Sequence, residues 1–136
     1  MTDQLLGAVQ RLSDAFAIRS AAATLACFVP VDDISYVGSE QDERAHGREA
    51  VASLLASLFG RAEAYSWRVT ALIAHQCANY AYVTVEAEGM AIGDDGELDV
   101  FPYRLSGLLE PSGDCWAWRA CHASVPERNR VDVEGP

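Results

Sequence analysis

The chain has 136 residues, half of them apolar and 22 % charged, which is enough for one hydrophobic core and typical of a globular protein. Its formal net charge is −10, and its ten basic residues are all arginines that stand singly along the sequence. Because nucleic acids and anionic membranes are bound by basic patches, this pattern argues against both as partners.

Two helices in series are predicted at the beginning of the chain. An apolar stripe with helical spacing, following a capping Thr or Asp, predicts the first helix up to about Arg19. The stripe consists of Leu5, Val9, Leu12 and Phe16. Ser20 is expected to cap a shorter helix over 21–26, which ends before Pro30 because the residue before a proline avoids the helical region.

A short strand over 34–37 and a third helix are predicted next. Gly38 stops the strand, and the polar stretch 39–46 is expected to be a loop. Gly47 opens the third helix, and Gly60 is expected to follow its end in the left-handed conformation. The apolar face of this helix contains Val51, Leu54, Leu55 and Leu58.

After Gly60 the apolar residues alternate with a period of two, which predicts strands. Four are expected, around 67–73, 81–87, 97–110 and 115–124, with turns at 93–96 and 111–114. Helices followed by hairpin-linked strands predict an α+β fold, in which helices cover one face of an antiparallel sheet. The domain is expected to span residues 1–126, and the charged segment 127–136 to be a flexible tail.

The four cysteines predict neither a metal site nor a disulfide framework. They form no C-x-x-C pair and have no histidine at zinc-finger spacing, so we expect reduced, core-filling thiols and no metal or cofactor. The N-terminus lacks the features of a signal peptide, and no apolar stretch approaches transmembrane length. We therefore expect a cytoplasmic protein, and the use of arginine without lysine indicates a bacterial source.

Four pieces of the sequence, in this order and spacing, resemble the SnoaL-like branch of the nuclear transport factor 2-like superfamily. They are Phe28-Val29-Pro30 with Asp32-Asp33, Tyr36-Val37-Gly38-Ser39, Gly47-Arg48-Glu49-Ala50-Val51, and Tyr103-Arg104-Leu105-Ser106-Gly107 followed by Trp116-x-Trp118-x-x-x-His122-x-Ser124. The resemblance implies a curved antiparallel sheet wrapped around three N-terminal helices, with a conical pocket for a small hydrophobic molecule and a homodimer formed through the outer face of the sheet. The superfamily includes a steroid isomerase, polyketide cyclases, a dehydratase and an epoxide hydrolase, so the fold alone does not name a reaction.

His122 is the first candidate for catalysis. On the last strand it is expected to share a face with Trp116, Trp118 and Ser124, and the resemblance turns that face toward the cone. An imidazole there can act as a general acid or base, because its pKa lies near neutral pH. The alternative is a core histidine that donates to a backbone carbonyl or to Ser124.

Asp32 is the second candidate, and aromatic residues complete the expected pocket. Asp32 and Asp33 are neighbours in an extended segment and point opposite ways, so at most one faces the pocket, and turn formation is the alternative. The expected pocket residues are Phe16, Phe28, Tyr36, Trp67, Tyr103, Trp116, Trp118 and Ser124. Tyr36 and Tyr103 offer hydroxyl donors to a ligand carbonyl, although aromatic residues on strands also simply fill cores.

Two functional hypotheses remain open. Compared with the steroid isomerase, the sequence has Phe16 where the resemblance places the oxyanion-binding tyrosine, and Val37 or a gap near the base aspartate, so ketosteroid enolisation is not expected. The first hypothesis is an isomerase, cyclase or dehydratase that transfers a proton on a small apolar substrate. The second is a non-catalytic ligand-binding or dimerisation module, and the size of the cavity distinguishes the two.

Overall fold

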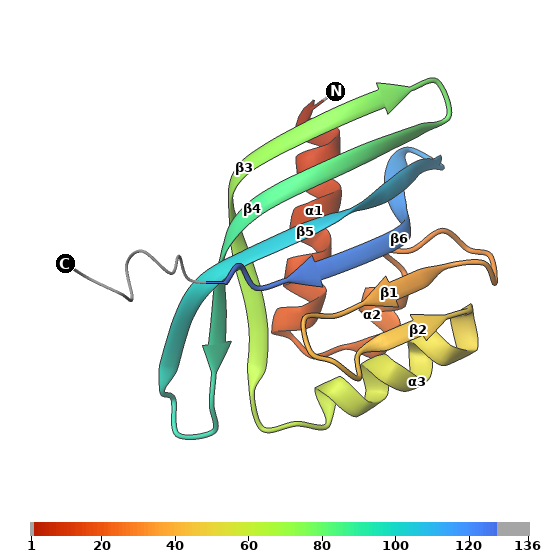
Figure 1. Cartoon of the computed structure of the whole chain (residues 1–136). Coiled ribbons are helices and arrows are strands. Elements are labelled where there is room, and N and C mark those ends of the chain that lie inside the picture. Colours follow the sequence, from red (N-terminus) through yellow and green to blue (C-terminus); the bar gives the residue numbers. More distant parts are fainter. Residues whose placement is uncertain (1, 128–136) are drawn as a thin grey trace.

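Three helices pack against one face of a curved sheet in the computed structural model, which describes residues 2–127 (Figure 1). The helices are α1 (Thr2–Ala17), α2 (Ala21–Leu25) and α3 (Arg48–Phe59). The four residues of the predicted apolar stripe of α1 are all buried beneath the sheet. Ser20 caps α2, since its side chain accepts a hydrogen bond from the N–H of Ala23. The three helices are therefore placed as the sequence predicts.

The sheet contains six strands in the order β2-β1-β6-β5-β4-β3. Their bounds are β1 Ser35–Val37, β2 Arg44–His46, β3 Ala64–Cys77, β4 Tyr80–Ile92, β5 Leu98–Ser112 and β6 Cys115–Ser124. The long strands β3 to β6 are linked by hairpins and pair antiparallel, which confirms the predicted α+β class. The short β1 pairs parallel with β6, so the sheet is mixed at this end.

Two local expectations are wrong. The polar stretch 39–46 contains β2, which pairs antiparallel with β1 and lies beside α3 (Figure 1). Gly60 follows α3 with a φ of −80°, not in the left-handed region. The chain continues into a further turn there, in which the N–H of Arg61 bonds to the carbonyl of Leu58, so this helix end does not require a left-handed residue.

A buried serine fixes α1 to the edge strand β3. The hydroxyl of Ser13 donates to the carbonyl of Trp67 at 2.9 Å and accepts from its N–H at 2.9 Å. An edge strand leaves such backbone groups without a partner strand, and here one side chain satisfies both. This contact holds Trp67 against the end of α1, where the pocket described below begins.

The boundaries and the cysteines complete the description. The expected flexible tail lies almost wholly in 128–136, outside the described residues. All four cysteines are free thiols. Among residues 2–127, no helix combines the length and the hydropathy needed to cross a membrane.

Candidate functional site

A small pocket opens where the ends of α1 and α3 meet the beginnings of β3 and β5. Its volume is about 60 Å³. About 10–15 Å³ is enough to hold one water molecule, so the pocket has room for a few waters or for a group of similar size. The lining residues are Phe16, Tyr36, Ser39, Glu40, Glu43, Leu58, Phe59, Tyr65, Ser66, Trp67, Phe101 and Tyr103.

Aromatic rings form one connected wall of this pocket. The ring of Phe16 on α1 lies 5.2 Å from that of Phe59 on α3 and 5.3 Å from that of Trp67 on β3, measured between centroids. Trp67 lies 5.5 Å from Tyr103, whose ring in turn contacts that of Phe101 at 6.0 Å. These tilted and edge-on contacts are favourable geometries for aromatic pairs, so the wall is a packed and ordered surface.

Two phenols project into the pocket from β1 and β5. The side chains of Tyr36 and Tyr103 interact through a hydrogen bond. Burial is the main cause that raises the pKa of both phenols above their ordinary value. Both are therefore neutral at any pH near neutrality. One donates its single O–H to the other, so one hydroxyl remains to bind a carbonyl or a developing oxyanion.

A carboxyl group accompanies the phenols. The side chain of Glu43 comes from the turn before β2, and the residue is only 7 % exposed. Burial raises the pKa of this carboxyl, and a side-chain hydrogen bond with Glu40 raises it further. One of its oxygens, Oε1, accepts from the N–H of Glu40 at 3.3 Å, and the other lies 3.5 Å from Nη1 of Arg61. A buried carboxyl with a raised pKa beside two neutral phenols is a candidate acid or base.

Glu43 fits its position because Gly38 has no side chain. A Cβ atom at Gly38 would lie 2.8 Å from the Cβ of Glu43 and still closer to its carboxylate. The N–H of Gly38 also donates to the carbonyl of Glu43 at 2.7 Å. Glu43 is not among the residues predicted from the sequence, and the available signal for it is a glycine that stops a strand just before an acid-rich loop.

The guanidinium of Arg61 contacts the carboxylates of Glu40 and Glu43 but does not line the pocket. Its guanidinium forms an ion pair with Glu40, which lowers the pKa of Glu40 mainly through that hydrogen bond. Arg61 itself is held by its backbone, because its carbonyl accepts from Nη1 of Arg19 at 2.8 Å. The segment between α3 and β3 is thereby fixed to the loop that carries Glu40 and Glu43.

His122 lies on the outer face of the sheet, so the expectation that it shares a face with Trp116 and Trp118 is wrong. The pairing of β5 with β6 changes from Leu109–Trp118 to Leu108–Ala120, which leaves Arg119 as an extra residue. Because side chains alternate along a strand, this β-bulge moves every later residue to the opposite face. Cys121 and Ala123 are therefore the inward residues; His122 is exposed, and neither it nor Ser124 lines the pocket.

Asp32 does not face the pocket either. Its side chain is exposed, and its carbonyl accepts hydrogen bonds from the N–H groups of Ile34 and Arg48. Asp32 thus serves the turn that precedes β1, which is the alternative raised from the sequence. The side chain of Asp33 also points away from the pocket, toward the surface network described next.

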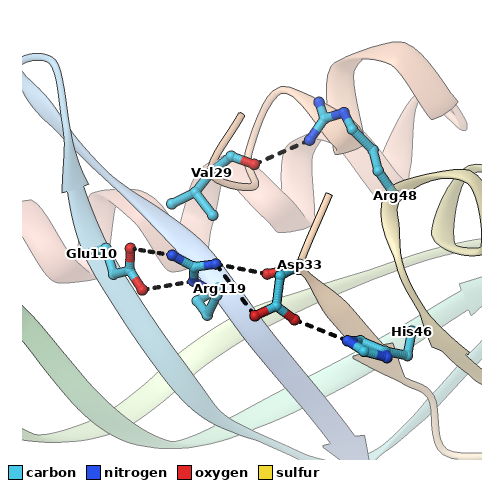
Figure 2. A network of polar contacts seen from close by, with 6 residues as sticks. All are labelled: Val29, Asp33, His46, Arg48, Glu110 and Arg119. Carbon is cyan, nitrogen blue, oxygen red and sulfur yellow. Dashed lines mark hydrogen bonds and ion pairs between the residues drawn. The ribbon is translucent and has the colours of Figure 1, made fainter. Parts of the chain in front are cut away.

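Figure 2 shows this surface network around Arg119. The guanidinium of Arg119 donates to both carboxylate oxygens of Glu110, at 2.7 and 3.0 Å, and to the carbonyl of Asp33 at 2.8 Å. The carboxylate of Asp33 pairs with His46 at 2.9 Å, and this hydrogen bond is the main cause that lowers its pKa. The bulged residue of β6 thus ties β5 to the turn before β1, and the network is structural.

The other expected pocket residues divide into two groups. Phe16, Tyr36, Trp67 and Tyr103 line the pocket. Phe28, Trp116 and Trp118 are buried in the core away from it.

Comparisons with known proteins agree with this fold. The family model of the SnoaL-like domain matches residues 6–128. A proposed dehydratase of the NTF2-like family from Streptomyces avermitilis shares the fold with a TM-score of 0.79 at 17 % identity, over 93 % of this chain and 96 % of that chain. An NTF2-like superfamily protein from Salmonella enterica gives a TM-score of 0.78 at 16 % identity, over 98 % of this chain and 96 % of that chain. A ketosteroid isomerase-like protein from Erwinia carotovora gives a TM-score of 0.72 at 19 % identity, over 93 % of this chain and 96 % of that chain. No curated protein matches the sequence.

Proposed function

The chain belongs to the SnoaL-like domain family, and from this premise we propose that its pocket binds a small, mostly apolar molecule and transfers a proton on it. Isomerases, cyclases and dehydratases work in this way. A proposed dehydratase and a ketosteroid isomerase-like protein are among the proteins that share the fold. The observation that carries the proposal is the buried carboxyl of Glu43, whose pKa is raised toward the range where an acid or base works best.

In this proposal the carboxyl group of Glu43 and the phenols of Tyr36 and Tyr103 have different roles. Glu43 removes a proton from a carbon next to a carbonyl group, and the electron pair moves onto the carbonyl oxygen. The pair Tyr36 and Tyr103 stabilises that oxygen through the one O–H that their mutual hydrogen bond leaves free, since both phenols stay protonated. Glu43 then returns the proton, either to another carbon or to a leaving hydroxyl group.

Proton transfer can be tested by following hydrogen–deuterium exchange of small ketones in deuterated water by NMR. We expect the wild-type protein to accelerate exchange of small ketones such as acetone. Glu43→Gln should lower that acceleration by about a hundredfold or more, the usual contribution of a general base. The control is Glu97→Gln, the same change at an exposed turn position, which should leave the rate unchanged. Equal rates for the wild type and Glu43→Gln would refute this role of Glu43.

A non-catalytic binding module is the second candidate, and the size of the pocket favours it. Pockets for drug-sized ligands have volumes of about 300–1,000 Å³, whereas this one has about 60 Å³. A ligand that binds without any exchange or conversion would support this candidate. The calorimetric titrations described below measure binding independently of turnover.

The homodimer is likewise a proposal. The outer face of β3 and β4 exposes Ile73 and Tyr82, at 59 % and 46 %. A second copy of the chain packed on this face would bury both side chains. Light scattering coupled to size-exclusion chromatography should give twice the monomer mass for the wild type and the monomer mass for Ile73→Glu. A monomeric wild type would refute the dimer.

A further inference from the structure

We propose that the pocket selects a small organic cation, of the alkylated ammonium class. This inference rests on the proposed function in that it concerns the same pocket, and it adds the charge of the molecule that is bound. Three observations carry it: the charge of the lining, the aromatic wall, and the polar groups that remain incompletely paired.

The lining residues carry negative charge only. Glu40 and Glu43 both belong to the lining, and no Arg, Lys or His does, among the described residues. Arg61 contacts both carboxylates without being part of the lining, so one positive charge is paired with two negative charges. The pocket therefore keeps a net negative charge, in a chain whose formal net charge is −10.

The aromatic wall supplies the second attraction. Seven of the twelve lining residues are aromatic, and contacts of 5.2 to 6.0 Å between ring centroids link Phe59, Phe16, Trp67, Tyr103 and Phe101. Aromatic faces attract cations that lie within about 6 Å of the ring centre, and cages of such rings recognise alkylated ammonium groups. An anionic ligand would meet two carboxylates and would gain nothing from the ring faces.

Two polar groups of the pocket wall lack a full set of partners. The carboxylate of Glu43 accepts from one backbone N–H at 3.3 Å, and Arg61 lies 3.5 Å away, which is weak compensation for a buried charge. A cation in the pocket would improve that compensation. The indole Nε1–H of Trp67, a second polar group of the wall, is buried and has no partner in residues 2–127.

The size of the pocket limits the cation. A volume of about 60 Å³ holds only a few water molecules, so the bound group must be small. Tetramethylammonium, with five non-hydrogen atoms, is the smallest quaternary ammonium ion and fits this limit best. Choline carries the same trimethylammonium centre on a hydroxyethyl chain.

The test compares choline with its neutral isostere, 3,3-dimethylbutan-1-ol, by isothermal titration calorimetry of the full chain. The two molecules have the same shape and differ only in the charge at the quaternary centre. We expect choline to bind about tenfold more tightly or better. Glu43→Gln should remove most of that advantage without weakening the isostere, and Glu97→Gln, at an exposed turn, should change neither. The indole N–H signal of Trp67 in NMR spectra should shift on binding.

The possible outcomes separate this inference from the proposed function. Two results would overturn the inference of a cationic ligand while leaving a pocket for a small apolar molecule. One is that the isostere binds as tightly as choline, and the other is that acetate binds more tightly than tetramethylammonium. Ketone exchange that depends on Glu43, in a protein that binds no cation, would do the same. Binding of choline without any ketone exchange would support the cation and refute the proton transfer. The comparison of choline with its isostere uses the wild-type protein, so it is decisive even if Glu43→Gln fails to fold.

Discussion

The position of Glu43 depends on the missing side chain of Gly38, and Gly38→Ala tests this directly. A methyl group at Gly38 would lie 2.8 Å from the Cβ and 3.0 Å from the Cδ of Glu43. Because the Cβ is fixed by the backbone, a change of side-chain rotamer cannot relieve the whole overlap. The β1–β2 turn must shift, and the carboxyl group of Glu43 must leave its buried position.

The expected cost follows from two opposing terms. Forcing an extra methyl group into a packed site costs typically about 1–3 kcal/mol. Replacing glycine by alanine also reduces the entropy of the unfolded chain, which stabilises the native state by about 0.4–1 kcal/mol. We therefore expect Gly38→Ala to lower the free energy of unfolding by about 1–2 kcal/mol. Choline binding should be lost together with the buried carboxyl.

Urea denaturation followed by circular dichroism measures this change, with Gly60→Ala as the matched control. At Gly60 an added methyl group would meet only the carbonyl oxygens of Ala56 and Ser57 at 3.5 Å, an ordinary contact, so its stability should stay equal or rise slightly. In the double variant Gly38→Ala/Glu43→Ala the overlap with the carboxylate disappears and only the Cβ contact remains. The two substitutions should then be non-additive by about 1 kcal/mol. Equal stability of Gly38→Ala and Gly60→Ala, or strict additivity in the double variant, would refute the reasoning.

Three further predictions concern single side chains. Burial raises the pKa of Glu43 above its ordinary value, so the stability that the protonated carboxyl contributes is lost as pH rises through the raised pKa, and Glu43→Gln should gain stability relative to the wild type over that rise in urea titrations. Arg119 lowers the pKa of Glu110, so their pair stabilises the fold above the ordinary carboxyl pKa; Arg119→Ala should cost about 1 kcal/mol at neutral pH, and the difference should shrink as pH falls through the lowered pKa of Glu110, to what the bond to the Asp33 carbonyl contributes. Ser13→Ala should cost about 1–3 kcal/mol in thermal or urea unfolding, because it leaves both backbone groups of Trp67 without their partner; an unchanged midpoint for Ser13→Ala would mean that water replaces the hydroxyl.

The elements that the sequence predicts correctly are those with a periodicity of their own. The apolar stripe of α1 and the alternation along the long strands are local signals, and they place the helices and the four long strands, although β3 and β4 extend well beyond the predicted 67–73 and 81–87. The three-residue strand β2 has no such signal, because Arg44, Ala45 and His46 become a strand only by pairing with β1. Its assignment depends on tertiary contacts that no short window of sequence contains.

The face on which His122 lies shows a second limit. Alternation predicts a face only if no residue is inserted, and the bulge at Arg119 is such an insertion. A signal existed in the neighbouring strand, since Gly107 comes so close to Ala120 that an added Cβ would lie 3.0 Å from its carbonyl carbon. A glycine inside a strand pattern indicates a bulge or a close backbone approach. Gly107 therefore indicates that the register of the last hairpin is irregular. It does not indicate which residues change face.

The pocket combines groups that the fold holds in different ways. Tyr36 and Tyr103 are fixed by the register of β1 and β5, so any chain with this sheet can place residues there. Glu43 comes from a short turn, and its inward position depends on Gly38 and on the ion pair that Glu40 forms with Arg61. A change of a few residues in that turn would alter the charge of the pocket while leaving the sheet intact. Likeness of fold at 16 to 19 % identity therefore does not carry over the charge of the pocket, which in this chain is set by Glu40 and Glu43 between β1 and β2.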